Sequence, residues 1–259
     1  MKIGLLDSGV GGFSVLREIH QLIPGAQLHY VADSSWCPYG NKPGHIICER
    51  VTGIADYLLE AGAEVLVIAC NSATIHAVGS LRATYPLPVV GMEPAVKPAA
   101  ELTRTGVVGV LATEASIAGE KFHQLVNTHA RGVRVITRPC PRFVELVESG
   151  TLQGDEVNEA IDEAITPLIA SDADVLVLGC THYPFLRPAI EQRLPEGITL
   201  IDTGPAVAKR VASLIPELSD LSKEPTNIHI ETTGSLEQLD LLLPKLLPDL
   251  TASTSEAGF

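Results

Sequence analysis

Two apolar segments of this sequence end in the same way, with a cysteine followed by small polar residues. Residues 65–69 lead into Cys70, and residues 175–179 lead into Cys180. Short apolar runs bounded by turn residues are typical of buried strands in a parallel sheet. In open α/β sheets, ligands bind just beyond the carboxyl ends of such strands. The sequence therefore predicts a parallel α/β fold with two thiols placed where a ligand would bind.

Apolar runs typical of strands alternate with longer segments of helical periodicity along most of the chain. The expected strands are 3–6, 27–32, 65–69, 88–91, 106–112, 133–137, 175–179 and 228–232. The expected helices are 13–23, 45–61, 116–128, 155–170 and 236–243, together with one that ends near 85 and one that ends at 215. This alternation predicts doubly wound parallel sheets.

The pattern starts again near residue 106. The strand 106–112 resembles 3–6, the dipeptide Cys140-Pro141 echoes Cys37-Pro38, and the Cys180 segment echoes the Cys70 segment. The echoes occur in the same order at a nearly constant offset, whereas chance similarity between aliphatic strands would not preserve that order. We infer a duplication that produced two similar α/β domains related by pseudo-twofold symmetry, with the active site in the cleft between them.

The expected domain boundaries follow from this duplication. The first domain comprises residues 1–96 and the returning residues 206–259, which include a polar linker after residue 215. Its tail from about residue 249 has the composition of a disordered terminus. The second domain comprises residues 97–205.

Composition restricts the partners and the compartment. The chain has 259 residues, 46% of them hydrophobic and only 4% aromatic, which indicates a large aliphatic core. A formal charge of −13 argues against nucleic acid or an anionic membrane as the main partner. Five widely spaced cysteines are typical of a reduced, cytoplasmic protein. Asp7 interrupts the first apolar segment too early for a signal peptide, and no run approaches the ~20 residues of a membrane span.

Cys70 and Cys180 differ from the other cysteines because each is expected to end a strand and open a helix. The positive end of a helix favours a thiolate. Two thiols on opposite sides of one carbon could remove a proton from one face and return it to the other, which inverts a stereocentre without a cofactor. Suitable polar neighbours are Asn71, Ser72 and Thr74 for one thiol, and Thr181 and His182 for the other, and Asp7 at the end of the first strand is a further candidate for the site.

Other interpretations of these residues remain open at this point. A redox pair would require C-x-x-C spacing, and metal binding would require a cluster of closely spaced Cys and His; the sequence has neither. Gly9 and Gly11 followed by Asp33 imitate a dinucleotide fingerprint. However, the third glycine position is Ser14, and the charge of Asp7 would face a bound pyrophosphate.

Four motifs resemble those of the glutamate racemases, within the cofactor-independent aspartate/glutamate racemase family. They occur in the family's order and span most of the chain: Asp7-Ser8-Gly9-Val10-Gly11-Gly12, Pro38-Tyr39-Gly40, Cys70-Asn71-Ser72-Ala73-Thr74 and Gly179-Cys180-Thr181-His182-Tyr183-Pro184. The third motif usually has threonine and then serine where this chain has Ser72 and Thr74, so both hydroxyl groups are kept. Pro43 replaces a more usual serine in the loop after the second motif.

The resemblance implies a role for each site residue. Cys70 would act on D-glutamate with the help of Asp7, and Cys180 on L-glutamate with the help of His182. Glu148 matches, better than Glu145, a family glutamate that supports this histidine. The resemblance further implies a substrate-binding set of Asp7, Ser8, Tyr39, Gly40, Asn71, Ser72, Thr74, Thr181 and His182.

The resemblance also implies a setting and leaves alternatives. The family needs no cofactor or metal and supplies D-glutamate for bacterial peptidoglycan, and dimers are common in it, so a homodimer is one expectation. The alternatives are an aspartate or other amino-acid racemase of the same superfamily, a nucleotide-dependent oxidoreductase, and a non-catalytic protein that binds acidic amino acids.

Overall fold

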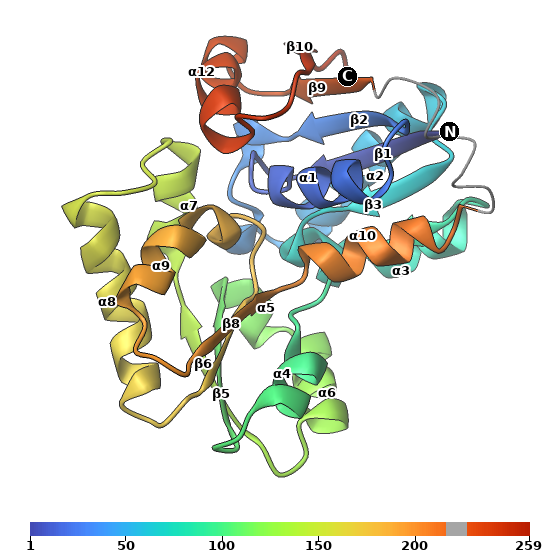
Figure 1. The fold of residues 1–259 in the computed structure, drawn as a ribbon. Helices are drawn as coiled ribbons and strands as arrows, with labels where there is room; N and C mark the ends of the chain where they lie inside the picture. The colour runs from blue at the N-terminus through green and yellow to red at the C-terminus, as the bar shows by residue number, and fades with distance from the viewer. Residues whose placement is uncertain (216–226) are drawn as a thin grey trace. The chain divides into compact units, whose positions relative to one another are not determined.

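The computed structural model describes residues 1–215 and 227–259, and these form two compact units (Figure 1). The first unit contains residues 1–92 and 204–259, and the second contains residues 93–203. The expected polar linker after residue 215 lies outside the described residues. Among the described residues, no helix has both the length and the apolar character needed to cross a membrane.

A parallel sheet of six strands forms the centre of the first unit. Its order is β10-β9-β2-β1-β3-β4, and every neighbouring pair is parallel. The strands are β1 (Lys2–Asp7), β2 (Gln27–Ala32), β3 (Val65–Ile68), β4 (Val89–Val90), β9 (Ile228–Thr232) and β10 (Ser253–Glu256). Because β9 pairs with β2, the last part of the chain completes the sheet that the first part begins.

Helices cover both faces of this sheet. Neighbouring side chains of β2 point to opposite faces: Tyr30 contacts Phe13 of α1, and His29 lies beside Tyr57 of α2. Helix α10 packs beside α1, and α3 packs beside α2. The helices are α1 (Phe13–Leu22), α2 (Gly44–Glu60), α3 (Asn71–Thr84), α10 (Gly204–Ala212) and α12 (Leu236–Leu246).

The prediction of a disordered tail from about residue 249 is wrong. Residues 253–256 form β10, which pairs with β9 in register Ser253↔His229 to Glu256↔Thr232. The terminal Phe259 ring packs 5.0 Å from that of Tyr57. Backbone hydrogen bonds attach an edge strand to its neighbour, so a segment of serine and threonine can pair with β9 without contributing an apolar face. Composition alone does not detect that stabilisation.

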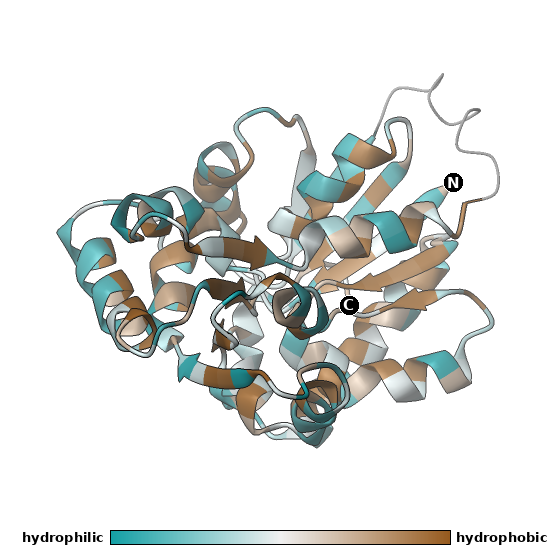
Figure 2. Cartoon of the chain, turned by 60° about the horizontal axis from the view of Figure 1, so that its bottom comes forward, coloured by the Kyte–Doolittle hydropathy of each residue, from teal (hydrophilic) through white to brown (hydrophobic). Residues whose placement is uncertain are grey.

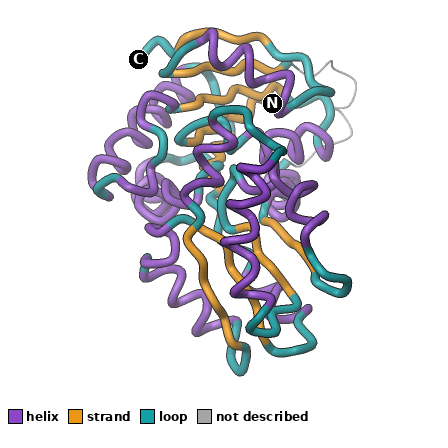
Figure 3. The backbone as a smooth tube through the Cα atoms, turned by 90° about the vertical axis from the view of Figure 1, so that its left-hand side faces the viewer, coloured by secondary structure: helices purple, strands orange, loops and turns teal. Residues whose placement is uncertain are grey.

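The second unit repeats the arrangement on a smaller scale. Its parallel strands β5 (Val107–Ala112), β6 (Arg134–Pro139), β7 (Val175–Leu178) and β8 (Thr199–Asp202) have the order β6-β5-β7-β8, which matches β2-β1-β3-β4. The helices around it are α4 (Val96–Leu102), α5 (Glu114–Ala118), α6 (Glu120–His129), α7 (Pro141–Glu148), α8 (Asp155–Ile169) and α9 (Arg187–Arg193). In Figure 3 the orange strands of this unit are flanked by purple helices.

One expected helix of the second unit is divided. The sequence predicts a continuous helix over 116–128, whereas α5 ends at Ala118 and α6 begins at Glu120. Gly119 between them has extended backbone angles (φ −68°, ψ 136°). Glycine is a poor helix former, so the break falls at the residue where leaving the helix costs least.

The central strands are buried on both faces. All four residues of β3 and all four of β7 are buried, and Figure 2 shows strands coloured brown along much of their length beside helices of alternating brown and teal. This pattern explains why the sequence shows continuous apolar runs at these strands rather than alternation. The buried strands hold the residues that follow them, Cys70 and Cys180, at fixed positions within each unit.

Asp174 fixes the loop between α4 and β5 in the second unit. Its carboxylate accepts hydrogen bonds from the Thr103 hydroxyl (2.5 Å), the Arg104 backbone N–H (2.7 Å), and the Thr105 N–H (3.2 Å) and hydroxyl (3.1 Å). Burial alone would raise the pKa of Asp174, but these hydrogen bonds outweigh it and lower the pKa from 3.8 to about 2. The charged form therefore stabilises the folded state at pH values above about 4, and that contribution is lost as the pH falls toward 2.

We expect Asp174→Asn to be about 2 kcal/mol less stable than the wild type at pH 6, the scale of hydrogen bonds to a charged group. The difference should shrink between pH 4 and pH 2 as the wild-type carboxylate becomes protonated. Urea unfolding at several pH values measures it. Asp172→Asn is the control, because Asp172 is exposed at a positive φ (64°) that asparagine also adopts. A difference that stays constant down to pH 2 would refute the assignment.

Candidate active site

Cys70 lies at the junction between β3 and α3 in the first unit. It is the N-cap of α3, and its Sγ accepts a hydrogen bond from the Ala73 backbone N–H at 3.4 Å. The side chain is 5% exposed. An N-terminal helix position favours a negative charge on the sulfur. The expectation that this cysteine ends a strand and opens a helix is therefore confirmed.

Asp7 and Ser8 lie next to Cys70 because β1 and β3 are adjacent in the sheet. The Asp7 carboxylate is fully buried, and its Oδ1 accepts hydrogen bonds from the Ser8 N–H (2.6 Å) and hydroxyl (3.2 Å). The Cys70 thiol donates to the Ser8 Oγ at 3.9 Å. A chain of polar contacts thus connects Asp7 to the thiol through Ser8.

Gly12 is required for this arrangement. A Cβ at this position would lie 2.6 Å from the Tyr30 hydroxyl and 2.9 Å from the Asp7 Cβ. The Tyr30 hydroxyl in turn donates to the Gly9 carbonyl at 2.7 Å. The absence of a side chain at Gly12 therefore permits the close packing around Asp7.

Tyr39 is held by a network of charged groups. Its hydroxyl donates to Asp33 Oδ2 at 2.6 Å, and Arg50 forms two hydrogen bonds with the same carboxylate, at 2.6 and 3.0 Å. Burial, with contributions from Asp33 and Cys70, raises the pKa of Tyr39 far above its usual value, so the phenol stays neutral. The short helix Tyr39–Asn41, which includes Gly40, packs against α3.

The remaining candidates of the first unit lie in the first turn of α3. Asn71, Ser72 and Thr74 are all buried beside Cys70. Thr74 also has a structural contact, because its Oγ1 accepts a hydrogen bond from the Met92 N–H at 3.1 Å. This bond ties the segment after β4 to the helix that Cys70 caps.

Cys180 occupies the equivalent place after β7 in the second unit, but its local structure differs. It is 8% exposed, and the chain continues into a short 3-10 helix, Tyr183–Leu186, before α9 begins. The prediction that Cys180 opens a helix in the same way as Cys70 is therefore wrong in detail. Gly179 is needed here, since a Cβ would lie 2.9 Å from the Leu111 carbonyl oxygen of β5.

A histidine and a glutamate extend from Cys180. The Cys180 Sγ lies 3.7 Å from His182 Nδ1, and His182 Nε2 lies 2.5 Å from Glu148 Oε1 at the end of α7. His182 is buried, as is Thr181 between it and the cysteine. A carboxylate on one ring nitrogen stabilises a protonated imidazole, and the other nitrogen can then exchange a proton with the sulfur. Glu145 is exposed and makes no such contact in the described residues.

Cys140 has a structural role in the same unit. Its carbonyl accepts a hydrogen bond from the Tyr183 hydroxyl at 2.9 Å. Burial raises the pKa of the Cys140 thiol to about 12, so it remains protonated at neutral pH. Cys140 also stands at the N-cap of α7, directly before Pro141 in the first turn of that helix.

Two residues that hold Tyr39 are not among the candidates that sequence motifs indicate. Arg50 lies within α2, and no motif marks it; only its hydrogen bonds to Asp33 in the fold identify it. In the sequence, Asp33 belongs only to the pattern that imitates a nucleotide fingerprint. The signal that could identify it is an aspartate at the end of an apolar strand, followed by a loop with a tyrosine.

Comparison with known proteins finds relatives over nearly the whole chain. A family model described as Asp/Glu/Hydantoin racemase matches residues 3–211. The glutamate racemase of Ectopseudomonas mendocina (strain ymp) is 49% identical over 247 residues, covering 95% of this chain and 94% of that protein. The glutamate racemase of Pseudomonas entomophila (strain L48) is 48% identical, covering 94% and 93% of the two chains.

Solved structures show the same fold. The structure of Escherichia coli glutamate racemase with L-glutamate and the activator UDP-MurNAc-ala superimposes with a TM-score of 0.86 at 34% identity, covering 99% of both chains. A glutamate racemase isoform of Bacillus anthracis gives a TM-score of 0.87 at 27% identity, covering 99% of this chain and 97% of the other. The chain therefore belongs to the Asp/Glu/hydantoin racemase family, among the glutamate racemases.

Proposed function

We propose that this protein interconverts L-glutamate and D-glutamate by proton transfer at Cα between Cys70 and Cys180. The observation that carries the proposal is that each strand-end thiol has its own polar array, Ser8 and Asp7 for Cys70, and His182 and Glu148 for Cys180. The high identity to glutamate racemases over nearly the whole chain supports glutamate as the substrate.

In the proposed L-to-D direction, the Cys180 thiolate removes the Cα proton, and the Cys70 thiol donates a proton to the opposite face. The Cα–H bond of the L-enantiomer breaks, its electron pair remains on the substrate, and a new Cα–H bond forms from Cys70. The two thiols thereby exchange protonation states. The D-to-L direction reverses every step, so the mechanism requires both thiols to reach the same Cα.

The polar arrays set the protonation states that this reaction needs. Glu148 stabilises a positive charge on His182, which in turn stabilises the Cys180 thiolate. The N-terminal end of α3 and the Ala73 backbone N–H stabilise a thiolate at Cys70. When Cys70 becomes a thiolate, its proton passes to Ser8 Oγ while the Ser8 hydroxyl proton passes to the Asp7 carboxylate, and the reverse transfer restores the thiol. No cofactor or metal is required for these steps.

The proposed substrate-binding set consists of small hydroxyl and amide side chains and the adjacent loop. They would hold the ammonium and the two carboxylates of glutamate: Asp7, Ser8, Tyr39, Gly40, Asn71, Ser72, Thr74, Thr181 and His182. In the cell, the proposed role is supply of D-glutamate for peptidoglycan in the bacterial cytoplasm, by a homodimer.

Incubation of L-glutamate with the enzyme in D₂O tests this function, without added pyridoxal phosphate or metal. We expect loss of optical activity and deuterium at Cα, measured by circular dichroism and NMR. Racemisation of aspartate rather than glutamate would favour the related racemases, and saturable NAD or NADP binding would favour an oxidoreductase. Tight binding of glutamate without change of chirality would indicate a binding protein and overturn the proposal.

Glu148→Gln tests the array on the Cys180 side. A neutral amide stabilises a positive charge on His182 less well than a carboxylate does, so we expect kcat/KM to fall about tenfold. This loss is smaller than the loss expected when a group that itself transfers the proton is removed. Enantiomers have equal free energies, so kcat/KM must fall equally in both directions. The primary deuterium isotope effect on kcat/KM should therefore show which proton transfer has become slower. It should rise more with Cα-deuterated L-glutamate, whose proton Cys180 removes, than with Cα-deuterated D-glutamate.

Glu145→Gln is the matched control on the same helix, because Glu145 is exposed. It should leave both kcat/KM and the isotope effects unchanged. Equal rises of the isotope effect for both enantiomers in Glu148→Gln would contradict the assignment of Glu148 to the Cys180 side.

A further inference from the structure

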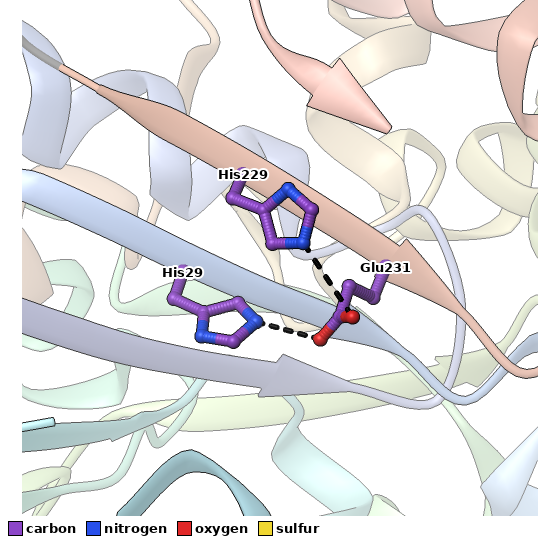
Figure 4. Close-up of side chains that lie close together, drawn as sticks. All are labelled: His29, His229 and Glu231. Atoms are coloured by element: carbon purple, nitrogen blue, oxygen red, sulfur yellow. Dashed lines mark hydrogen bonds and ion pairs between the residues drawn. The ribbon is translucent and has the colours of Figure 1, made fainter. Parts of the chain in front are cut away.

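Two histidines and a glutamate converge in the first unit at residues that the racemase motifs do not include (Figure 4). His29 lies on β2, and His229 and Glu231 lie on β9. His29 and His229 are directly opposite in the β2–β9 ladder. Side chains two residues apart on a strand share a face, so Glu231 lies on the same face as His229. The backbone thus places three possible ligands together.

The ligand atoms of these residues are close to one another. His29 Nε2 lies 2.6 Å from Glu231 Oε2, and His229 Nε2 lies 3.5 Å from Glu231 Oε1. One ligand atom from each residue lies within 4.8 Å of the other two. Nitrogen and oxygen ligands about 2.1 Å from a tetrahedral zinc ion lie roughly 3.4 Å apart, so small side-chain movements would create the required separation.

The surrounding groups orient His229 and Glu231. Ser253 Oγ lies 2.9 Å from His229 Nδ1, and Ser255 Oγ lies 3.2 Å from His229 Nε2. The Ser255 hydroxyl also donates to Glu231 Oε1 at 3.2 Å. The Tyr57 hydroxyl donates to Glu231 Oε1 at 3.0 Å. Supports of this kind on the outer side of a ligand are typical of metal sites.

The site is open to solvent on one side. The His229 side chain is 35% exposed and provides a route from solvent, whereas the other two ligands are buried.

We propose that His29, His229 and Glu231 form a binding site for a divalent late transition-metal ion, of the two-histidine, one-carboxylate type. Such donor sets bind Zn²⁺, Co²⁺ and related ions. On binding, the proton that His29 shares with Glu231 moves to its Nδ1 or leaves to solvent. The ion would link β2 to β9, where residues 204–259 join the sheet of residues 1–92.

Titration of the metal-free protein with CoCl₂ tests the site, because Co²⁺ reports its ligands by absorption. We expect one equivalent to bind with the visible bands of nitrogen and oxygen ligation and without a thiolate-to-metal charge-transfer band, which separates this site from the five cysteines. The thermal midpoint should rise with Co²⁺ concentration, since an ion that binds only the folded state stabilises it.

Two variants and one control complete the test. His229→Gln, at the partly exposed ligand, should abolish the absorption and the thermal shift, and Ser253→Ala should weaken binding about tenfold. His129→Gln changes an exposed histidine of the second unit and should bind as the wild type does. Absence of stoichiometric binding, a thiolate band, or unchanged binding in His229→Gln would each overturn the proposal.

Discussion

Replacement of either site thiol by serine is expected to lower kcat for glutamate racemisation at least about 10³-fold. A serine hydroxyl has nearly the shape of the thiol, but it ionises far less readily, so it is a poor base at the substrate Cα. Cys70→Ser retains an N-cap acceptor for α3, and Cys180→Ser retains a polar atom beside His182. Both variants should therefore remain folded, as thermal unfolding can verify.

The two variants should differ in hydrogen exchange. In D₂O, Cys70→Ser still carries Cys180, so L-glutamate should acquire deuterium at Cα faster than it racemises. Cys180→Ser should show the same behaviour with D-glutamate. Cys48→Ser is the control, because Cys48 lies within α2 and its sulfur contacts only the Ser80 hydroxyl among described hydrogen-bond partners. Full racemisation by both site variants, or the opposite exchange pattern, would rule out the two-thiol mechanism.

The sequence was sufficient to predict the thiol positions because short-range rules determine them. A continuous apolar run identifies a strand buried on both faces, and the carboxyl end of such a strand is where a parallel sheet exposes side chains to a ligand. Cys70 and Cys180 follow directly. The contacts between Asp7, Ser8 and Cys70 depend in addition on the adjacency of β1 and β3, which no local pattern in the sequence establishes.

Other parts of the fold could not be predicted because they depend on long-range packing. Helix α7, which carries Glu148, was not identified, although it begins with Pro141 after Cys140 and buries Phe143 and Val147. Eight residues give too little periodicity to separate a helix from a loop. Strand β10 depends on backbone pairing with β9, which the local sequence does not reveal.

The hydrogen bonds around Asp33 are a further feature that depends on tertiary contacts and not on local sequence. Asp33 is fully buried, and its carboxylate accepts four hydrogen bonds: one from Tyr39, two from Arg50 and one from the Thr233 hydroxyl at 2.8 Å. The partners come from the short helix Tyr39–Asn41, from α2 and from the segment after β9. No local pattern in the sequence connects these three places.

Asp33→Ala is expected to reduce the free energy of unfolding by about 3 kcal/mol, the scale for removal of one partner from a buried ion pair. The side chain of Arg50 is only 25% exposed, and its guanidinium lies 5.1 Å from the Trp36 ring and 5.6 Å from the Phe259 ring. It would remain beside these apolar rings without its counter-ion. Urea unfolding monitored by circular dichroism measures the loss.

A double-mutant cycle with Arg50→Ala separates this ion pair from loss of side-chain volume. If the pair is responsible, Arg50→Ala should cost about 1–3 kcal/mol less in the Asp33→Ala background than in the wild type. Asp56→Ala provides the comparison on α2, since Asp56 bonds Tyr85 at the surface and its removal should cost only about 1 kcal/mol. Additive effects of Asp33→Ala and Arg50→Ala would mean that burial of Asp33, rather than its pairing with Arg50, governs the stability of this region.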